Sequence, residues 1–159
     1  MSSDNNIKNI KEIILSLKQL CGKQEKCKSE IREKLKKWEL SDEKVEEIIS
    51  LLEKEKFIDE VRYTEFFIKD KLKFYKWGKI KLKYYLKIKQ IPNDIIRKGL
   101  DNIDETEYFN ILKSEIEKKL KSMNSKNQSK DKLVRYAQSK GFELDLIFSV
   151  INKNLTIEN

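Results

Sequence analysis

Histidine is absent from this sequence of 159 residues, and cysteine, proline and glycine are scarce, at two, one and four residues. Histidine is the commonest general base and metal ligand, so its absence removes most acid–base and metal-dependent mechanisms. Cys21 and Cys27 cannot complete a four-ligand zinc site, and the glycines are too isolated to form a phosphate-binding loop. We therefore expect no catalytic residues, no metal site, no cofactor and no enzymatic activity.

The sequence also lacks a long apolar run. No segment approaches the roughly 20 apolar residues that span a bilayer. The first six residues lack the basic and then apolar arrangement of a secretion signal. Two cysteines suit a reducing compartment better than a disulfide-stabilised domain. We expect a cytoplasmic monomer that makes no contact with membranes.

The residues that are abundant favour helices. Apolar residues make up 38% of the chain and charged residues 39%, with Leu, Ile, Lys and Glu prominent. These residue types have high helix propensity, and few glycines or prolines interrupt them. A core built from so few apolar residues must be thin, which suits small helical units that each depend on their neighbours.

One apolar pattern occurs three times, at a spacing of 51 residues. A fixed period of this kind is typical of a repeat protein. The pattern predicts an all-α fold of three tandem three-helix repeats, spanning residues 7–56, 57–103 and 104–153. The positions are Ile31, Leu35, Leu40, Val45 and Ile49 in the first repeat, Leu82, Leu86, Ile91, Ile96 and Leu100 in the second, and Leu133, Ala137, Phe142, Ile147 and Ile151 in the third.

Positive charge is concentrated in the second repeat. The chain carries a net charge of +8, but the window from Lys69 to Lys98 holds eleven Lys or Arg residues against two acids, a net +9. The remainder of the chain is therefore close to neutral, at −1. A basic region in an otherwise neutral chain indicates an anionic partner.

The lysines of this window are arranged in rows. Lys79, Lys83 and Lys87 are four residues apart on one flank of a predicted helix, and Lys76 extends the row. Lys69 and Lys73 form a second row on the preceding helix. Lysines often serve only to solvate a helix surface. Here the usual interleaved glutamates are missing, and like charges four residues apart destabilise a helix, so a functional patch is favoured.

Arg62 and the aromatic residues of the second repeat allow two interpretations. Arg62 contacts a partner or pairs with a nearby acid. Trp77 stacks on a base or a partner, or instead packs between repeats beside Gly78. Most of the remaining aromatic residues are expected to pack in the core or between repeats. They are Phe66, Phe67, Phe74, Tyr84 and Tyr85.

Several segments resemble the signature of the RecX regulatory proteins. The central match consists of Phe57-Ile58-Asp59-Glu60 with Arg62-Tyr63, then Phe67, then Lys76-Trp77-Gly78-x-Ile80. Weaker matches are Ser29-Glu30-Ile31 with Lys34-Leu35 in the first repeat, and Arg135-Tyr136 with Gly141-Phe142 in the third. The resemblance runs from about residue 8 to residue 153.

The resemblance implies a modulator of the RecA recombinase. Members of that family are elongated, curved proteins that bind RecA filaments on DNA and inhibit strand exchange, ATP hydrolysis and co-protease action, by occupying the filament groove or blocking filament growth. The expected partner is thus the RecA filament, with single- or double-stranded DNA as a further candidate. The residues assigned to partner or nucleic-acid contact are Arg62, Lys69, Lys73, Lys76, Trp77, Lys79, Lys83 and Lys87.

Two other functions stay open from the sequence. The last two helices of each repeat resemble a helix–turn–helix, so the chain could bind DNA directly and act without RecA. It could also be a structural helical adaptor, in which the lysines have no partner.

Overall fold

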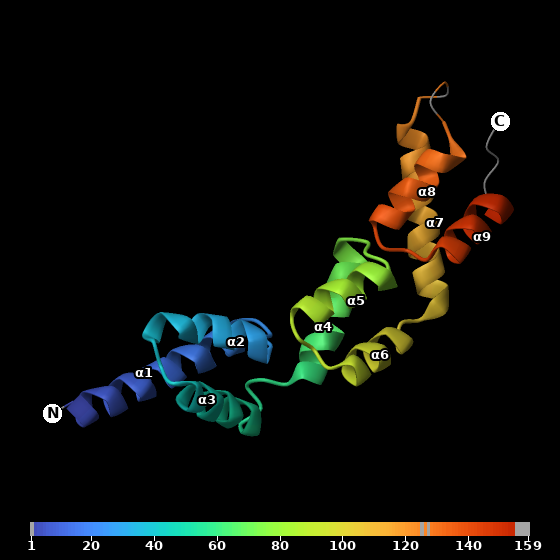
Figure 1. Ribbon diagram of the computed structural model, residues 1–159. Helices are drawn as coiled ribbons and strands as arrows, with labels where there is room; N and C mark the ends of the chain where they lie inside the picture. Colours follow the sequence, from blue (N-terminus) through green and yellow to red (C-terminus); the bar gives the residue numbers. More distant parts are fainter. Residues whose placement is uncertain (1, 125, 127, 155–159) are drawn as a thin grey trace. The chain divides into compact units, whose positions relative to one another are not determined.

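The computed structural model describes residues 2–124, 126 and 128–154, and the part of the chain that it describes is all-α (Figure 1). Its nine α-helices fall into three sets of three, which confirms the predicted tandem helical repeats. The helices are α1 (Ser2–Lys23), α2 (Lys28–Leu35), α3 (Asp42–Lys54), α4 (Glu60–Phe74), α5 (Lys79–Ile88), α6 (Asn93–Asp101), α7 (Glu105–Ser122), α8 (Lys130–Ser139) and α9 (Leu144–Asn154), with a short 3-10 helix, η1 (Lys36–Trp38), after α2.

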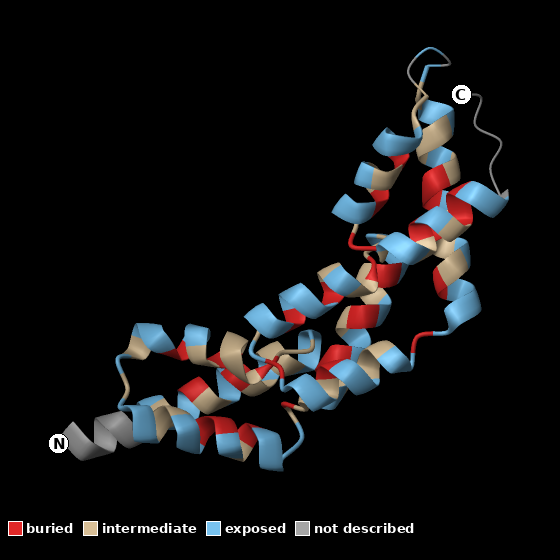
Figure 2. Ribbon diagram, turned by 45° about the vertical axis from the view of Figure 1, so that its right-hand side comes forward, coloured by how far each residue is buried: buried red, intermediate tan, exposed pale blue. Residues whose placement is uncertain are grey.

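The apolar pattern that repeats every 51 residues forms the core. Of its fifteen positions, all but Leu40, Val45 and Leu100 are buried. The buried positions lie as stripes along one side of each helix, with exposed positions along the other side (Figure 2). Burying one stripe per helix is how a thin core can stabilise three short helices.

The backbone repeats with the same period. The turn after the second helix of each repeat contains one residue in the left-handed region, namely Glu39 (φ 51°), Gln90 (φ 61°) and Gly141 (φ 93°). These residues are 51 positions apart. A left-handed residue ends a helix by turning the chain back. Gly141 is the residue type that most readily adopts this conformation, whereas Glu39 and Gln90 carry no such sequence signal.

Polar side chains cap the N-termini of several helices. The Ser41 hydroxyl accepts a hydrogen bond from the Lys44 amide (3.2 Å), and the Asp59 carboxylate accepts one from the Arg62 amide (3.0 Å). Each bond satisfies an amide that the helix leaves unpaired. The N-cap residue of helix α2 is Cys27.

By compactness the chain divides into two units, and the boundary falls within α4. The first comprises the residues up to Phe66 together with Lys89–Ile91, and its core consists of Ile13, Leu17, Ile31, Leu35, Ile48, Ile49, Leu52 and Ile58. The second comprises Phe67–Ile88 and the residues from Pro92 onward, and its fully buried side chains include Leu82, Leu86, Ile96, Leu112, Ile116, Leu133 and Phe142.

The expectation that five aromatic residues of the second repeat pack in the core or between repeats was wrong for most of them. Phe66, Phe74, Tyr84 and Tyr85 are exposed by 51%, 76%, 61% and 37%, and Phe67 is half-buried. The core positions of α5 are instead filled by Leu82 and Leu86.

Among the described helices, none combines the length and the apolar character that a membrane span requires.

Candidate partner-binding groove

Helix α5 is held at its start by three backbone amides that bond to the third repeat. The Gly78 amide donates to the Lys140 carbonyl (2.7 Å) and the Ile80 amide donates to the Gly141 carbonyl (3.0 Å). The Lys79 amide donates to the Tyr108 hydroxyl (2.9 Å). The first amides of a helix have no hydrogen-bond partner within the helix, so these three bonds satisfy them. We call this set of bonds, from Gly78, Lys79 and Ile80 to the third repeat, a joint.

Gly78 is required by the closeness of this joint. A Cβ at residue 78 would lie 2.3 Å from the Gly141 carbonyl oxygen, which is well inside van der Waals contact. Two backbone segments can approach this closely only where one has no side chain. The joint therefore fixes where α5 begins and which of its sides faces solvent.

The first unit contains an equivalent joint. The Ser29 hydroxyl donates to the Lys89 carbonyl (2.7 Å), and the Lys28 amide donates to the Glu60 carboxylate (3.4 Å). Lys28 and Lys89 lie 51 residues before Lys79 and Lys140. The two joints thus follow the same period as the core.

Each joint contains a buried tyrosine. Tyr63 interacts with the side chains of Cys27 and Glu30, and Tyr108 donates a hydrogen bond to Glu143 while accepting from the Lys79 amide. Burial raises the pKa of both phenols above the usual value, and the neighbouring carboxylates, Glu30 beside Tyr63 and Glu143 beside Tyr108, raise it further. Both hydroxyls therefore stay protonated at neutral pH and remain hydrogen-bond donors.

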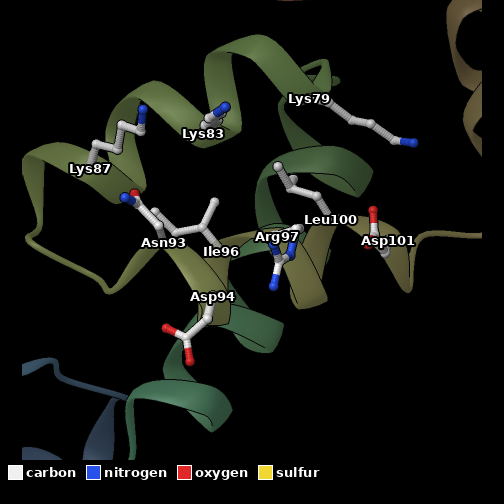
Figure 3. Close-up of a pocket in the computed structure, with 9 residues that line it drawn as sticks. All are labelled: Lys79, Lys83, Lys87, Asn93, Asp94, Ile96, Arg97, Leu100 and Asp101. Atoms are coloured by element: carbon white, nitrogen blue, oxygen red, sulfur yellow. The ribbon is translucent and has the colours of Figure 1, made fainter.

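The three predicted lysines of α5 line an open groove of about 660 Å³ between α5 and α6. Figure 3 shows these lysines spaced along α5, with Ile96 and Leu100 of α6 across from them. Arg97 of α6 adds a fourth cation, which was not predicted as a site residue. The groove is lined by Lys79, Lys83, Lys87, Asn93, Asp94, Ile96, Arg97, Leu100 and Asp101.

The first repeat contains a similar basic row that is neutralised. Lys28, Arg32 and Lys36 stand 51 residues before Lys79, Lys83 and Lys87. Each of them forms an ion pair, with Glu53, Glu46 and Glu33 respectively, at 2.8 Å. The Arg32–Glu46 pair raises the pKa of the arginine and lowers that of the glutamate.

In the second repeat the corresponding cations are not paired. Within the described part of the chain, no ion pair within 4.0 Å involves Lys79, Lys83, Lys87 or Arg97. Two carboxylates, from Asp94 and Asp101, line the groove against four cations, so its lining carries a net +2. A concave surface with excess positive charge attracts anions.

Comparison with known proteins agrees with this organisation. The model of the RecX second three-helix domain matches residues 59–100, and that of the third three-helix domain matches residues 105–151. Regulatory protein RecX of Clostridium beijerinckii is 32% identical over 162 residues, covering 99% of this chain and 74% of that protein. The chain belongs to the RecX family. It is thus a member of a family of regulatory proteins.

Further RecX proteins are similar to the chain. RecX of Clostridium tetani is 34% identical over 134 residues, and the chain spans 61% of that protein. The crystal structure of RecX from Lactobacillus salivarius has a TM-score of 0.81 at 20% identity, covering 92% of this chain and 97% of that one. A crystal structure of regulatory protein RecX has a TM-score of 0.83 at 18% identity, covering 96% and 77%. The two structures support the fold.

Five of the residues that resemble the RecX signature take part in the joints. Ser29, Glu60 and Tyr63 belong to the joint of the first unit, and Gly78 and Gly141 belong to that of the second. The groove lysines, by contrast, belong to no motif that the resemblance includes. These five residues of the signature therefore stabilise the scaffold on which the groove lysines are placed.

The other predicted lysines do not line the groove. Lys69 and Lys73 are exposed on α4, and Lys76 lies in the turn after α4 with φ 59°. No ion pair within 4.0 Å in the described residues involves any of the three. The structure thus brings together three of the six predicted lysines in one groove.

Trp77 lies within an aromatic cluster. Its ring stacks on Tyr85 (centroids 4.8 Å apart, planes at 29°) and contacts Phe67 and Tyr75 at 6.2 and 6.1 Å. The Lys81 ammonium lies 4.7 Å from the centre of the Trp77 ring. Cation–π contacts of this kind hold a ring in place. Trp77 is half-buried, so part of the cluster is accessible.

Arg62 is engaged inside the first unit. Its guanidinium donates to the Glu25 carboxylate (2.6 Å) and to the carbonyls of Lys56 and Phe57 (3.1 and 3.4 Å). The Glu25 hydrogen bond raises the pKa of Arg62 further. These bonds correspond to the alternative in which Arg62 pairs with a nearby acid, and contact with a partner stays a prediction.

Among the described residues, no group of three His, Cys, Asp or Glu side chains could hold a metal ion.

Proposed function

We propose that this chain binds RecA filaments on DNA through the α5–α6 groove and inhibits the recombinase, ATPase and co-protease activities of RecA. The observation that supports this most is the row of Lys79, Lys83 and Lys87, whose counterparts in the first repeat are neutralised by glutamates. The chain acts in this proposal as a cytoplasmic monomer that catalyses no reaction.

In this proposal the groove attracts the filament electrostatically, and the volume of the bound protein blocks access to the filament. Four cations face an acidic surface of RecA or the phosphates of its DNA, where desolvation strengthens each contact. The exposed Lys69 and Lys73 and the half-buried Lys76 supply further positive charge. A protein held in the filament groove excludes incoming DNA or repressor, and one held at a filament end stops the addition of RecA subunits.

A charge-reversal experiment tests the proposal. RecA ATP hydrolysis on single-stranded DNA is measured with the wild-type chain, with Lys83→Glu/Lys87→Glu, and with the control Lys54→Glu/Lys132→Glu. All four lysines are exposed and lie in helices. Each variant replaces two lysines by glutamates, so both change the net charge of the protein equally. We expect the groove variant to inhibit at least about tenfold less, since each charge-assisted bond contributes about 1.5–3 kcal/mol. Equal inhibition by both variants contradicts the proposal.

Direct DNA binding without RecA is the second candidate, and the placement of the unpaired cations on the last two helices of a repeat favours it. The logarithm of its affinity for naked duplex DNA would fall with the logarithm of salt concentration, with a slope of about −0.9 per phosphate contacted. Tight, salt-sensitive binding to naked DNA without any inhibition of RecA supports this candidate. Inhibition of RecA at concentrations where naked DNA is unbound supports the first.

A further inference from the structure

Helix α5 carries apolar side chains on its solvent side. Ile80, Tyr84 and Ile88 are exposed by 57%, 61% and 53%, while Leu82 and Leu86 on the same helix are fully buried. At about 100° per residue, the three exposed side chains form one stripe that lies opposite the two leucines. We call this stripe, Ile80, Tyr84 and Ile88, the outer face of α5.

The other repeats show that the fold does not need apolar residues at these positions. The corresponding residues of α2 and η1 are Ser29, Glu33 and Lys37, and those of α8 are Asp131, Arg135 and Ser139. All six are polar, as is usual on the solvent side of a helix. The apolar stripe is therefore confined to the second repeat, the same repeat that carries the unpaired cations.

The outer face continues into the aromatic cluster. Tyr84 contacts Tyr85 with ring centroids 5.3 Å apart, and Tyr85 stacks on Trp77. Tyr75, which is exposed by 52%, contacts Trp77 in turn. Isolated exposed apolar residues are ordinary, but a contiguous exposed patch of this kind marks a binding surface.

Cations border the outer face on both sides. Lys79, Lys83 and Lys87 precede its three residues by one position each, and Lys81 follows on the other flank. An apolar centre with a charged rim is the usual anatomy of a protein–protein interface. The complementary surface is an apolar stripe bordered by carboxylates. We infer that the outer face of α5 binds an acidic amphipathic segment of a partner protein.

This inference rests on the proposed function and makes it more specific, because it assigns the outer face to the protein component of the filament and not to DNA. Of the three outer-face residues only Tyr84 has a ring, and Ile80 and Ile88 on either side of it are aliphatic, whereas surfaces that bind single-stranded DNA stack successive bases on aromatic rings. A second copy of this face is also unsuitable, because its basic rim would repel the first.

The test removes the apolar stripe without changing charge. Ile80→Gln/Tyr84→Gln/Ile88→Gln is compared with the control Leu15→Gln/Val61→Gln/Leu144→Gln, in which the three replaced residues are also exposed, by 58%, 48% and 42%. Glutamine keeps helix propensity high. The binding of each labelled protein is measured with RecA filaments on single-stranded DNA and with oligo(dT) alone.

We expect the outer-face variant to bind filaments at least about tenfold more weakly, because central apolar anchors dominate interface affinity. Its binding to oligo(dT) should equal that of the wild type. Unchanged filament binding overturns the inference. A parallel loss on oligo(dT) overturns it in favour of a nucleic-acid surface. Wild-type binding to vesicles of phosphatidylglycerol that the variant loses overturns it in favour of a lipid surface.

A separate arm distinguishes this inference from the proposed function. If the wild-type chain does not bind RecA filaments, the proposed function fails. The probe is then a labelled helical peptide with leucines every three to four residues and glutamates between them. Saturable binding of this peptide by the wild type, lost in the outer-face variant and kept in the control, supports the inference. No binding, or equal binding by both variants, overturns it.

Discussion

Arg97 stands 51 residues after Glu46 and is one of the residues that line the groove together with Lys83, whereas Glu46 forms an ion pair with Arg32 in the first repeat. The same two positions of the repeat thus hold opposite charges in one copy and like charges in another. Surface ion pairs contribute little to stability, so the fold tolerates the exchange. Two like charges that line one groove suit the binding of an anion.

Replacing Arg97 by glutamate should leave the fold intact. The carboxylate would face Lys83 as Glu46 faces Arg32, so the free energy of unfolding should stay equal or rise by up to about 1 kcal/mol. Urea denaturation followed by circular dichroism measures this. A clear loss of stability would show that Arg97 has a structural role, which the charge comparison between the repeats does not predict.

Gly78→Ala should destabilise the second unit. The added Cβ would lie 2.3 Å from the Gly141 carbonyl oxygen, so the joint must open. Overpacking of this kind costs typically about 1–3 kcal/mol. The matched control is Gly22→Ala, where the new Cβ meets no atom within 4 Å other than those of its chain neighbours and of its own helix backbone. Because Gly22 lies within α1, that change should stabilise the protein by up to about 1 kcal/mol. Equal effects of the two substitutions on urea denaturation would refute the close approach.

Tyr108→Phe should destabilise the joint that positions α5. The substitution removes the acceptor of the Lys79 amide and the donor to Glu143. Leaving partly buried groups unsatisfied costs about 1–3 kcal/mol. Tyr75→Phe is the control, because Tyr75 is half-exposed and no described hydrogen bond involves its hydroxyl. If both variants unfold at the same urea concentration as the wild type, the Tyr108 hydroxyl does not support α5.

Glu30 should contribute stability that depends on pH. Burial opposes its charged form, but the Cys27 amide and the Lys89 ammonium outweigh burial and lower its pKa below 4.5. A lowered folded-state pKa gives stability that is present above pH 4.5 and is lost as pH falls through the folded value. The difference in unfolding free energy between the wild type and Glu30→Gln should therefore shrink between neutral and strongly acidic pH. A constant difference across that interval would contradict the assignment.

The core and the repeats were predictable from the sequence because burial imposes a period on apolar residues. Leu82 and Leu86 are buried where the 51-residue pattern places them, and Asp59 begins α4 where its side chain can accept an amide. The left-handed turns at Glu39 and Gln90 were not predicted, because neither residue is a glycine. Their position would have followed from Gly141 by subtracting the repeat length.

The site was predicted in part. The row of Lys79, Lys83 and Lys87 follows from helical spacing, and the structure places all three in one groove. Arg97 was missed because no other basic residue stands three or four positions from it, so it belongs to no row of the kind that the lysines form. A comparison with Glu46, which occupies the same position of the first repeat, would have shown that Arg97 reverses the charge at this position. The exposure of Ile80 and Tyr84 was missed because aromatic and aliphatic residues at helical spacing usually belong to the core.

Arg97→Glu separates the charge of the groove from the stability of the fold, because this substitution neutralises the groove lining while the fold is expected to persist. The decisive measurement is the inhibition of RecA ATP hydrolysis by this variant. We expect the variant, with an unfolding free energy no lower than that of the wild type, to inhibit RecA at least about tenfold less than the wild type. If the folded variant inhibits RecA as strongly as the wild type, the charge of the groove does not drive RecA binding.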